Sequence, residues 1–502
     1  MRTEKKRIMG IDWGTSRTYP AIIDEDGNCQ SLLPSGNRLC GGGIPSLFAY
    51  NSQDGAVLCD DVLSEELEIY APDQVVSSIK MHLEESYELD GAIFSGEEIA
   101  TYIIETQIGY ARDELEIQDL EADETKVVIC APVSFGTTER MILRNAFERA
   151  GYQVIRIVPE PVAAAIYYGR KGTVLVVDIG AGTTDVAIVR ENPMITDWNP
   201  YPYLYVDSSG IEVAGDMFDE KIADYLAERF IAEVAGMDAA QLKDRESMAY
   251  RRLVVAARKA KEALTNKQEI GVTFNGREAG SGRIRLTREE MNRAIHPLVQ
   301  EIMECIRKFL LRNPEILEKD LEIIMTGGSS YIPYIREQLA EVCNHVPKDR
   351  IGVRAPEKAI GFGAAIFAAD MDIIHPRVDF SYGVDTYIDD VEMIETLIPA
   401  GTELPYTVEK DYYTRHDEQT KVSFRLYEYR SRERTLPIDE SKRMKISKTT
   451  HEFYKAVPRG TRCTARMTLT EDGILTLQVT SDVSDHVGEV RCSIFTDSDS
   501  KN

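Results

Sequence analysis

Two short turns in this chain place a carboxylate, small residues and hydroxyl groups between apolar runs. The first lies in IMGIDWGTSRTYPAIID (residues 8–24) and the second in VLVVDIGAGTTDVAIV (residues 174–189). Glycine lets backbone N–H groups approach a phosphate, and Thr and Ser hydroxyls supply further donors. Because the pattern occurs twice, we expect two similar halves whose turns hold a polyphosphate from both sides. The leading carboxylates, Asp12 and Asp178, then need a cation beside the phosphates, and hydrated Mg²⁺ suits that geometry.

A third glycine-rich turn, TGGSSYIP (residues 326–333), ends an apolar run and opens a helix. Its Gly327 and Gly328 could receive the ribose or the α-phosphate of a nucleotide. The chain has no G-x-x-x-x-G-K-[ST] motif, and no G-x-G-x-x-G follows its first strand. These absences exclude the P-loop and Rossmann modes of nucleotide binding.

Alternating strands and helices must position the three turns. We expect a Gly-Pro turn into a strand over 41–50 and then a mostly helical acidic region up to about residue 123, followed by a buried strand, KVVICAPVSF, over 126–135. Further helices are predicted over 137–150, 216–270, 287–312 (with Thr287 as N-cap) and 355–370, and residues 321–342 are predicted to form a strand, a Gly-Gly-Ser-Ser turn and a helix. The last of these is rich in Gly and Ala, which allows close packing. After about Met371 short alternating strands predict a separate all-β domain, as in residues 421–429, 464–470 and 473–482, with a turn at TEDG (470–473).

Composition and charge limit the classes of partner. The 502 residues are enough for roughly three domains, and 43% hydrophobic with 28% charged residues is typical of a globular protein. A formal net charge of -26 argues against a nucleic-acid partner, which would need a basic surface. No apolar run approaches the length of a membrane span, and no apolar stretch of a secretory signal follows the basic N-terminus. We therefore expect a cytoplasmic protein that binds neither nucleic acid nor membrane.

The motifs follow one another in the order found in the actin-fold ATPase superfamily. They are the Asp-x-Gly-Thr turn, APVSF, VPEPVAAAIYYG, VVDIGAGTTD, GDMFD, TGGSSYIP and AIGFGAA. More narrowly, the chain resembles the seventy-kilodalton heat-shock chaperones of the DnaK type over about residues 7–370 and, more faintly, over 380–495. The resemblance implies an α/β, actin-like (ribonuclease H-like) two-lobed ATPase domain followed by a small all-β sandwich domain.

The resemblance also implies roles for single residues. Asp12, Glu160 and Asp178 match carboxylates that hold magnesium-bound waters and orient the attacking water, and Asp185 matches a further acid near the cation. Lys80 in VVSSIKMHLEE matches a catalytic lysine near the γ-phosphate, whose charge offsets the phosphate oxygens during transfer.

Other positions match contacts to ATP or ADP. The phosphate-binding positions are Gly14, Thr15, Ser16, Gly180, Ala181, Gly182 and Thr183. The positions around the ribose and adenine are Gly215, Asp216, Lys261, Thr265, Gly327, Gly328 and Ser329, with Tyr331 placed to stack on the base. Pro132 and Arg140 match a pair that relays nucleotide state to the neighbouring domain.

The chain departs from the family pattern at several points. Ala181 replaces a glycine of the second turn, and Trp13 makes the first turn bulkier. Glu262 and Tyr331 stand where the family usually has two arginines that sandwich the adenine. Tyr331 can still stack on a base, but Glu262 cannot form a cation–π contact, so we expect a different or weaker adenine site.

The resemblance divides the chain into an ATPase domain (1–370), a linker (371–379) and a β-sandwich substrate-binding-like domain (380–502). The linker MDIIHPRVD replaces the family's acidic, leucine-containing stretch and keeps Ile373-Ile374 as its apolar remnant. The sequence ends at Asn502, shortly after the β-domain, so we expect no helical lid and fast peptide exchange in both nucleotide states.

The function expected from the resemblance is a chaperone that couples ATP hydrolysis to binding of unfolded or extended polypeptide, with co-chaperones as further partners. A nucleotide-gated actin-like assembly protein and a small-molecule kinase of the same superfamily are the alternatives. The β-domain and Lys80 disfavour the assembly protein. A kinase needs a carboxylate base facing an acceptor, and Asp185 is the nearby candidate.

Overall fold

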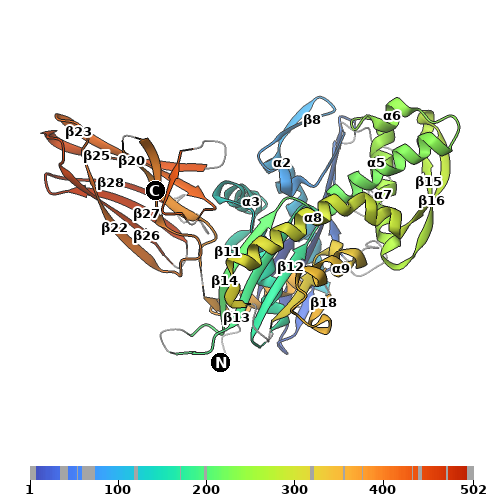
Figure 1. Cartoon of the computed structure of the whole chain (residues 1–502), viewed down its shortest axis with the longest axis horizontal. Coiled ribbons are helices and arrows are strands. Elements are labelled where there is room, and N and C mark those ends of the chain that lie inside the picture. Colours follow the sequence, from blue (N-terminus) through green and yellow to red (C-terminus); the bar gives the residue numbers. More distant parts are fainter. Residues whose placement is uncertain are drawn as a thin grey trace.

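The computed structural model describes residues 7–33, 43–53, 55–58, 74–117, 122–169, 171–196, 200–316, 321–353, 357–375, 377–389, 391–431, 433–438, 444–470 and 473–493. The molecule is elongated, with the C-terminal strands at one end and the helices of residues 215–266 at the other (Figure 1). The three turns lie between these ends, where two large mixed sheets approach each other.

The first turn belongs to a six-stranded sheet. Its strands are β1 (Arg7–Trp13), β2 (Arg17–Ile23), β3 (Cys29–Ser31), β4 (Ile44–Pro45), β10 (Ala122–Ala131) and β11 (Gln153–Pro159). They run in the order β11-β10-β1-β2-β3, with β4 also paired to β2. β1 is parallel to β10 and antiparallel to β2, so the turn joins neighbouring strands. Helices α2 (Gly96–Ile117) and α3 (Thr137–Arg149) share a buried core with this sheet.

The second turn belongs to a similar sheet. Its strands are β12 (Thr173–Ile179), β13 (Thr184–Glu191), β14 (Tyr203–Ile211), β17 (Glu322–Thr326), β18 (Ile351–Val353) and β19 (Ile374–His375). The order is β18-β17-β12-β13-β14-β19, with β12 antiparallel to β13 and parallel to β17. The repeated strand–turn–strand pattern of the sequence thus corresponds to the same hairpin in two sheets.

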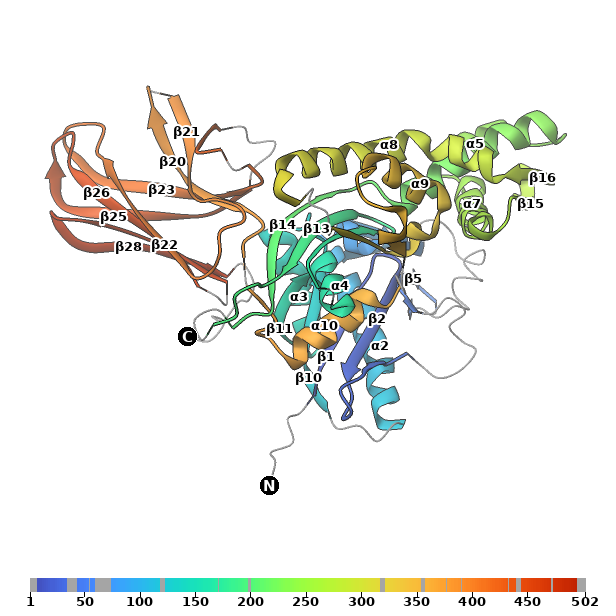
Figure 2. The same cartoon turned by 60° about the horizontal axis from the view of Figure 1, so that its bottom comes forward.

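Two helices of small residues lie between the sheets (Figure 2). They are α4 (Glu160–Tyr168) and α10 (Ala359–Ala369). A Cβ on Gly363 would lie 1.7 Å from the Ala163 carbonyl oxygen, and one on Gly10 would lie 2.0 Å from the Ala365 nitrogen. The close packing expected of the last helix is confirmed, because its glycine contacts exclude even a methyl group.

The second sheet carries a large helical layer. Its elements are α5 (Gly215–Glu233), α6 (Ala239–Lys243), α7 (Met248–Asn266), α8 (Arg288–Arg312), α9 (Pro333–Val342) and the hairpin β15 (Glu269–Asn275) with β16 (Ser281–Thr287), joined by short 3-10 turns at 277–279, 314–316, 328–331 and 348–350. The helical prediction over 216–270 is realised as three helices and the start of β15, because Asp238 and Ser247 cap new helices with their side chains. The predicted N-cap at Thr287 is confirmed, since its side chain accepts from Glu290 N–H. None of the described helices has the length and apolar character needed to cross a lipid bilayer.

The acidic region before residue 123 is less helical than predicted. Strand β5 (Leu47–Asn51) confirms the strand predicted over 41–50. Apart from α2, the described elements between β5 and residue 117 are strands β6 (Gly55–Leu58), β7 (Val75–Ser77), β8 (Ser86–Leu89) and β9 (Ala92–Ser95) and the 3-10 turn η2 (Ile79–His82). Asp90 and Gly91 join β8 to β9 with φ of 46° and 80°. An Asp-Gly pair with positive φ at both positions favours a tight hairpin, so the local turn chemistry outweighed the acidic composition.

All described elements after β19 are strands, as predicted. They are β20 (Ser381–Ile388), β21 (Val391–Ile398), β22 (Tyr406–Tyr413), β23 (Gln419–Tyr429), β24 (Thr435–Pro437), β25 (Met444–Val457), β26 (Arg462–Leu469), β27 (Ile474–Ser481) and β28 (Ser484–Ser493). One sheet has the order β24-β21-β20-β23-β25 and the other β22-β26-β27-β28, and both contribute to one core. The middle of the predicted TEDG turn lies outside the described residues.

Candidate active site

The second turn is a tight hairpin with a carboxylate on each strand. Asp178 and Asp185 are Cα partners in β12 and β13, and Gly180 N–H donates to the Thr183 carbonyl at 3.0 Å. Asp178, Thr183 and Asp185 are all buried. The break in the apolar run is therefore the hairpin turn itself, with both carboxylates beneath it.

The first turn meets the second. A Cβ on Gly182 would lie 2.9 Å from Thr15 Oγ1, so the two turns touch where they were expected to face a phosphate chain. Gly14 N–H closes the first turn onto the Arg17 carbonyl at 3.1 Å, while the Ser16 side chain is exposed. The structure thus brings the two predicted turns together.

The two unusual turn residues are accommodated without disturbing the turns. Ala181 is not among the described residues with positive φ, so it causes no backbone strain. Trp13 is fully buried and packs edge-on against Phe147, with 6.4 Å between ring centroids. Its bulk therefore lies in the core of the first sheet rather than in the turn, contrary to our expectation.

The third turn reaches the second from the other side. Ser329 Oγ donates to the Gly180 carbonyl at 2.9 Å, and Gly215 N–H donates to the same carbonyl at 3.1 Å. Gly327 has a φ of 79°, and a Cβ there would lie 2.5 Å from Asp178 Oδ1. Glycine is thus required at this position by both backbone conformation and space. The neighbouring Gly328 has open space around it.

One lysine and four carboxylates are buried around the turns. Their exposed fractions are 2% for Lys80, 7% for Asp12, 7% for Glu160, 3% for Asp178 and 0% for Asp185. Lys80 lies in η2 and donates from Nζ to Glu160 Oε1 at 2.5 Å. Glu160 opens α4 directly after β11, so the pair joins two elements that are 80 residues apart.

This crowding of charge shifts the pKa values of the group. Burial, reinforced by the charge of Glu160, raises the pKa of Asp12 to about 7, and the same two causes raise the pKa of Asp185 to about 7. Burial and the charges of Glu160 and Asp185 hold the pKa of Asp178 well above its ordinary value. Burial disfavours a charged Lys80, but Glu160 and Asp12 outweigh it and raise the pKa of this lysine. The cluster has more negative groups than Lys80 can neutralise, so a cation would stabilise it.

Two carboxylate oxygens here have no partner among the described residues. Asp178 Oδ1 and Asp185 Oδ2 are buried and accept no hydrogen bond from that part of the chain, and buried oxygens of this kind are costly unless something binds them. Among the described residues no three Asp, Glu, His or Cys side chains are close enough to coordinate one ion directly. The site therefore fits a cation that keeps its water shell, which is how Mg²⁺ is commonly held.

The remaining predicted residues lie along the helices beside this centre. Lys261 Nζ donates to the Gly215 carbonyl at 2.9 Å and pairs with Asp219 at 2.8 Å. Thr265 donates to the carbonyl of Lys261 in its own helix at 3.2 Å. Tyr331 is 47% exposed, and its hydroxyl donates to Glu357 Oε2 at 2.7 Å.

The sequence alone did not reveal two further residues that contact Asp216. Arg258 pairs with Asp216 at 3.0 Å and with Asp219 at 2.9 Å, and Ser78 Oγ donates to Asp216 Oδ2 at 2.6 Å. The position of Ser78 two residues before Lys80 was a sequence signal that it lies near the site. Its hydrogen-bond partner, Asp216, is 138 residues away and could not be found in this way.

Comparison with known proteins identifies the family. The "Hsp70 protein" family model matches residues 60–499, which is most of the chain. The chain belongs to the Hsp70 family. It is similar to the chaperone protein DnaK of Thermosipho melanesiensis (29% identical over 453 residues, 85% of this chain and 71% of that protein) and to that of Thermotoga maritima (27% over 454 residues, 85% and 71%). It is also similar to DnaK of Halobacterium salinarum (29% over 443 residues, 84% and 66%). As an Hsp70 it is an ATP-dependent chaperone and an ATPase, and it binds adenine nucleotide.

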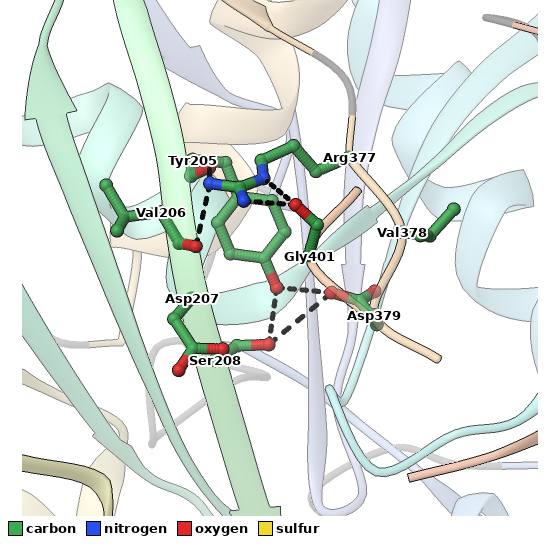
Figure 3. A pocket seen from close by; sticks show the side chains of 8 residues that line it. All are labelled: Tyr205, Val206, Asp207, Ser208, Arg377, Val378, Asp379 and Gly401. Carbon is green, nitrogen blue, oxygen red and sulfur yellow. Dashed lines mark hydrogen bonds between the residues drawn. The ribbon is translucent and has the colours of Figure 1, made fainter. Parts of the chain in front are cut away.

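This Hsp70 chain has a polar junction between its α/β part and its C-terminal strands. Arg377 donates to the carbonyls of Tyr205 and Val206 on β14 and also to that of Gly401, which lies among the C-terminal strands (Figure 3). The next charged residue, Asp379, accepts from the Tyr205 hydroxyl and pairs with Arg140 of α3 at 2.9 Å. The Arg140 and Asp379 side chains are both buried. Residues 377–379 are therefore bound to β14 and α3 on one side and to Gly401 on the other.

Two residues at the end of β23 and just after it also reach the segment that follows β10 of the first sheet. The buried carboxylate of Glu428 accepts from Thr137 N–H at 2.8 Å and from Thr137 Oγ1 at 2.5 Å, at the first turn of α3. Arg430 donates to the Val133 carbonyl at 2.5 Å, and Val133 N–H donates to Asp185 Oδ1 at 3.0 Å. One residue, Val133, therefore touches both the buried acidic centre and the C-terminal strands.

Proposed function

We propose that this Hsp70 couples ATP hydrolysis in residues 1–370 to binding of extended or unfolded polypeptide by residues 380–502, through a linker at 371–379. The first part is then a two-lobed, ribonuclease H-like ATPase domain, and the second a β-sandwich that binds the polypeptide. The observation that carries the proposal is the buried Lys80–Glu160 pair beside Asp12, Asp178 and Asp185, where the turns of two sheets meet.

The proposed roles follow from position and charge. Backbone N–H groups and hydroxyls of the turns at 14–16 and 180–183 bind phosphate oxygens. Lys80 neutralises charge that develops on the transferred phosphoryl group, which is the main catalytic need in phosphoryl transfer. Glu160, held at 2.5 Å by Lys80, orients the attacking water.

Asp12, Asp178, Glu160 and Asp185 would hold Mg²⁺ mostly through water. When bound, the cation supplies positive charge beside the phosphates and removes the need to protonate the raised-pKa carboxylates. The ribose and adenine then lie beside Gly215, Asp216, Lys261, Thr265 and the 327–331 turn, with Tyr331 against the base.

Coupling is proposed to run through the junction. Ile374 of the linker is buried and pairs β19 with β14, so the apolar remnant of the linker is an added strand of the second sheet. Arg140, the predicted relay residue, pairs with Asp379 in the same linker. Co-chaperones as partners and a cytoplasmic location belong to the same proposal.

Hydrolysis of ATP with and without an unfolded polypeptide tests the proposal. We expect phosphate release without any added acceptor, stimulation by the polypeptide, and loss of both in Lys80→Ala. Phosphate transfer only when a small-molecule acceptor is present would overturn it in favour of a kinase. Hydrolysis that polypeptide leaves unchanged would refute the coupling but not the ATPase.

A further inference from the structure

A side-chain hydrogen bond joins two separate cores near the turns. Ser78 Oγ donates to Asp216 Oδ2 at 2.6 Å. Ser78 precedes η2, whose Ile79 is buried in the core of the first sheet. Asp216 lies in the first turn of α5, whose buried residues belong to the core of the second sheet. Any motion that separates the two sheets at this point must break the bond.

The bond lies directly beside the proposed phosphate site. Asp216 N–H donates to the Ala181 carbonyl at 2.8 Å, so its backbone is fixed to the second turn. A Cβ on Gly182 would lie 2.6 Å from Met81 Cγ and Sδ, so η2 also rests on that turn through Met81. The segment that carries Lys80 therefore contacts the second turn through Met81 and the adjoining start of α5 through Ser78.

Ser78 and Asp216 are each held in position independently of the bond between them. Arg258 holds the other oxygen of Asp216 at 3.0 Å. Ser78 has φ of 58° and ψ of 27°, a left-handed conformation that is uncommon for a residue other than glycine. Such conformations persist where surrounding contacts determine them, and they are frequent at ligand clamps.

Lys80 has an anchor of its own. It pairs with Glu160 of α4, which belongs to neither side of the Ser78–Asp216 bond, and only 2% of Lys80 is exposed. Loss of the Ser78 hydroxyl should therefore leave the lysine in place while it releases the contact between the two cores.

We propose that Ser78 is a positioning residue that closes η2 over the bound nucleotide through Asp216 and so sets how long the nucleotide stays. The inference rests on the proposed nucleotide site between the turns. It assigns Ser78 to nucleotide retention and not to the chemical step.

The test measures two rates in the full chain. Release of a fluorescent ADP is followed by stopped flow after a chase with unlabelled ATP, and hydrolysis is followed in a single turnover of bound ATP. We expect Ser78→Ala and Ser78→Gly to release ADP about 10- to 100-fold faster, the effect of one hydrogen bond to a charged group. Single-turnover hydrolysis should stay within about two-fold. The glycine variant keeps the left-handed conformation available, and Ser77→Ala, at the exposed neighbouring position, is the matched control.

A cycle with Asp216→Ala, which removes both side-chain oxygens, completes the test. The double variant Ser78→Ala/Asp216→Ala should release ADP no faster than Asp216→Ala alone, since the bond can be lost only once. Additive effects, an unchanged release rate, or an equal change in both rates would overturn the inference. If the unmodified chain bound no ADP, the proposed nucleotide site itself would fail, and that result is distinguishable because it needs no variant.

Discussion

The acidic centre between the sheets and the junction with the C-terminal strands are both buried and polar, but they are built differently. The centre takes Asp12, Asp178 and Asp185 from two turns, each fixed by a short stretch of sequence, and adds the Lys80–Glu160 pair across 80 residues. The junction depends on side chains that meet across 239 residues (Arg140 and Asp379) and across 291 residues (Thr137 and Glu428). The centre has unpartnered carboxylate oxygens, whereas Glu428 accepts from Thr137 and Tyr382. The difference fits a centre that must admit a ligand and a junction that holds itself closed.

Of the substitutions considered, removal of Lys80 from the acidic centre should have the largest effect on hydrolysis. We expect Lys80→Ala to lower hydrolysis about 10²–10³-fold, because a preorganised charge at the reacting phosphoryl group is lost. The variant also leaves Glu160 buried without its partner, which costs stability of about 3–5 kcal/mol. Lys348→Ala, at an exposed lysine, is the matched control.

The double variant Lys80→Met/Glu160→Gln separates the two consequences. It should regain most of the stability in denaturant unfolding but none of the hydrolysis. Recovery of hydrolysis would show that Lys80 serves structure rather than chemistry.

Glu428→Gln should weaken the junction between α3 and the C-terminal strands. The amide has one acceptor oxygen in place of two and no charge at the first turn of α3, so hydrogen bonds to a charged group worth about 1.5–3 kcal/mol are weakened. We expect stimulation of hydrolysis by unfolded polypeptide to fall about ten-fold. Glu433→Gln, the same change at an exposed residue nearby, should keep full stimulation. A stimulation ratio that is equal in all three proteins would contradict the role of this contact.

The pH dependence of stability should distinguish the centre from the junction. Asp12 and Asp185 have pKa values of about 7 in the folded chain against 3.8 as the ordinary value, so the folded state binds more protons between these pH values. The free energy of unfolding without nucleotide or Mg²⁺ should therefore fall as pH rises through 7, by about 1 kcal/mol per group between pH 6 and 8.

Urea unfolding in EDTA at pH 6 and pH 8 measures this effect. Asp185→Asn should reduce the slope, and Mg²⁺ with ADP should reduce it further because the cation replaces the protons. Stability that increases from pH 6 to pH 8 would argue against the raised pKa values.

A substitution outside both regions shows whether a local loss of stability by itself changes hydrolysis. Thr287→Ala removes the side chain that caps α8 and should lower the free energy of unfolding by about 1 kcal/mol. Hydrolysis and its stimulation should be unchanged. A loss of hydrolysis comparable to that of Lys80→Ala would show that activity tracks general stability.

The sequence predicted most of the centre because its signals are local. Glycine, hydroxyl and Asp in one turn determine where backbone donors and carboxylates lie, as at Asp178 and Asp185. The Asp90-Gly91 hairpin carried an equally local signal, but the acidic composition around it concealed that signal. Arg258, Ser78 and Glu428 could not be predicted, because their partners are set by how helices and sheets pack and no spacing in the chain encodes the pairing. Trp13 illustrates the same limit, since its position in a turn did not reveal that its ring points into a core.

The glycine contacts of α10 constrain how the molecule can move. The Gly363 backbone lies against Ala163 of α4 and the Gly10 backbone lies against Ala365, so neither helix nor sheet can slide without collision. Rotation about this contact is the motion that such packing leaves open. Gly363→Ala would force α10 and α4 apart, because the added Cβ would lie 1.7 Å from the Ala163 carbonyl oxygen.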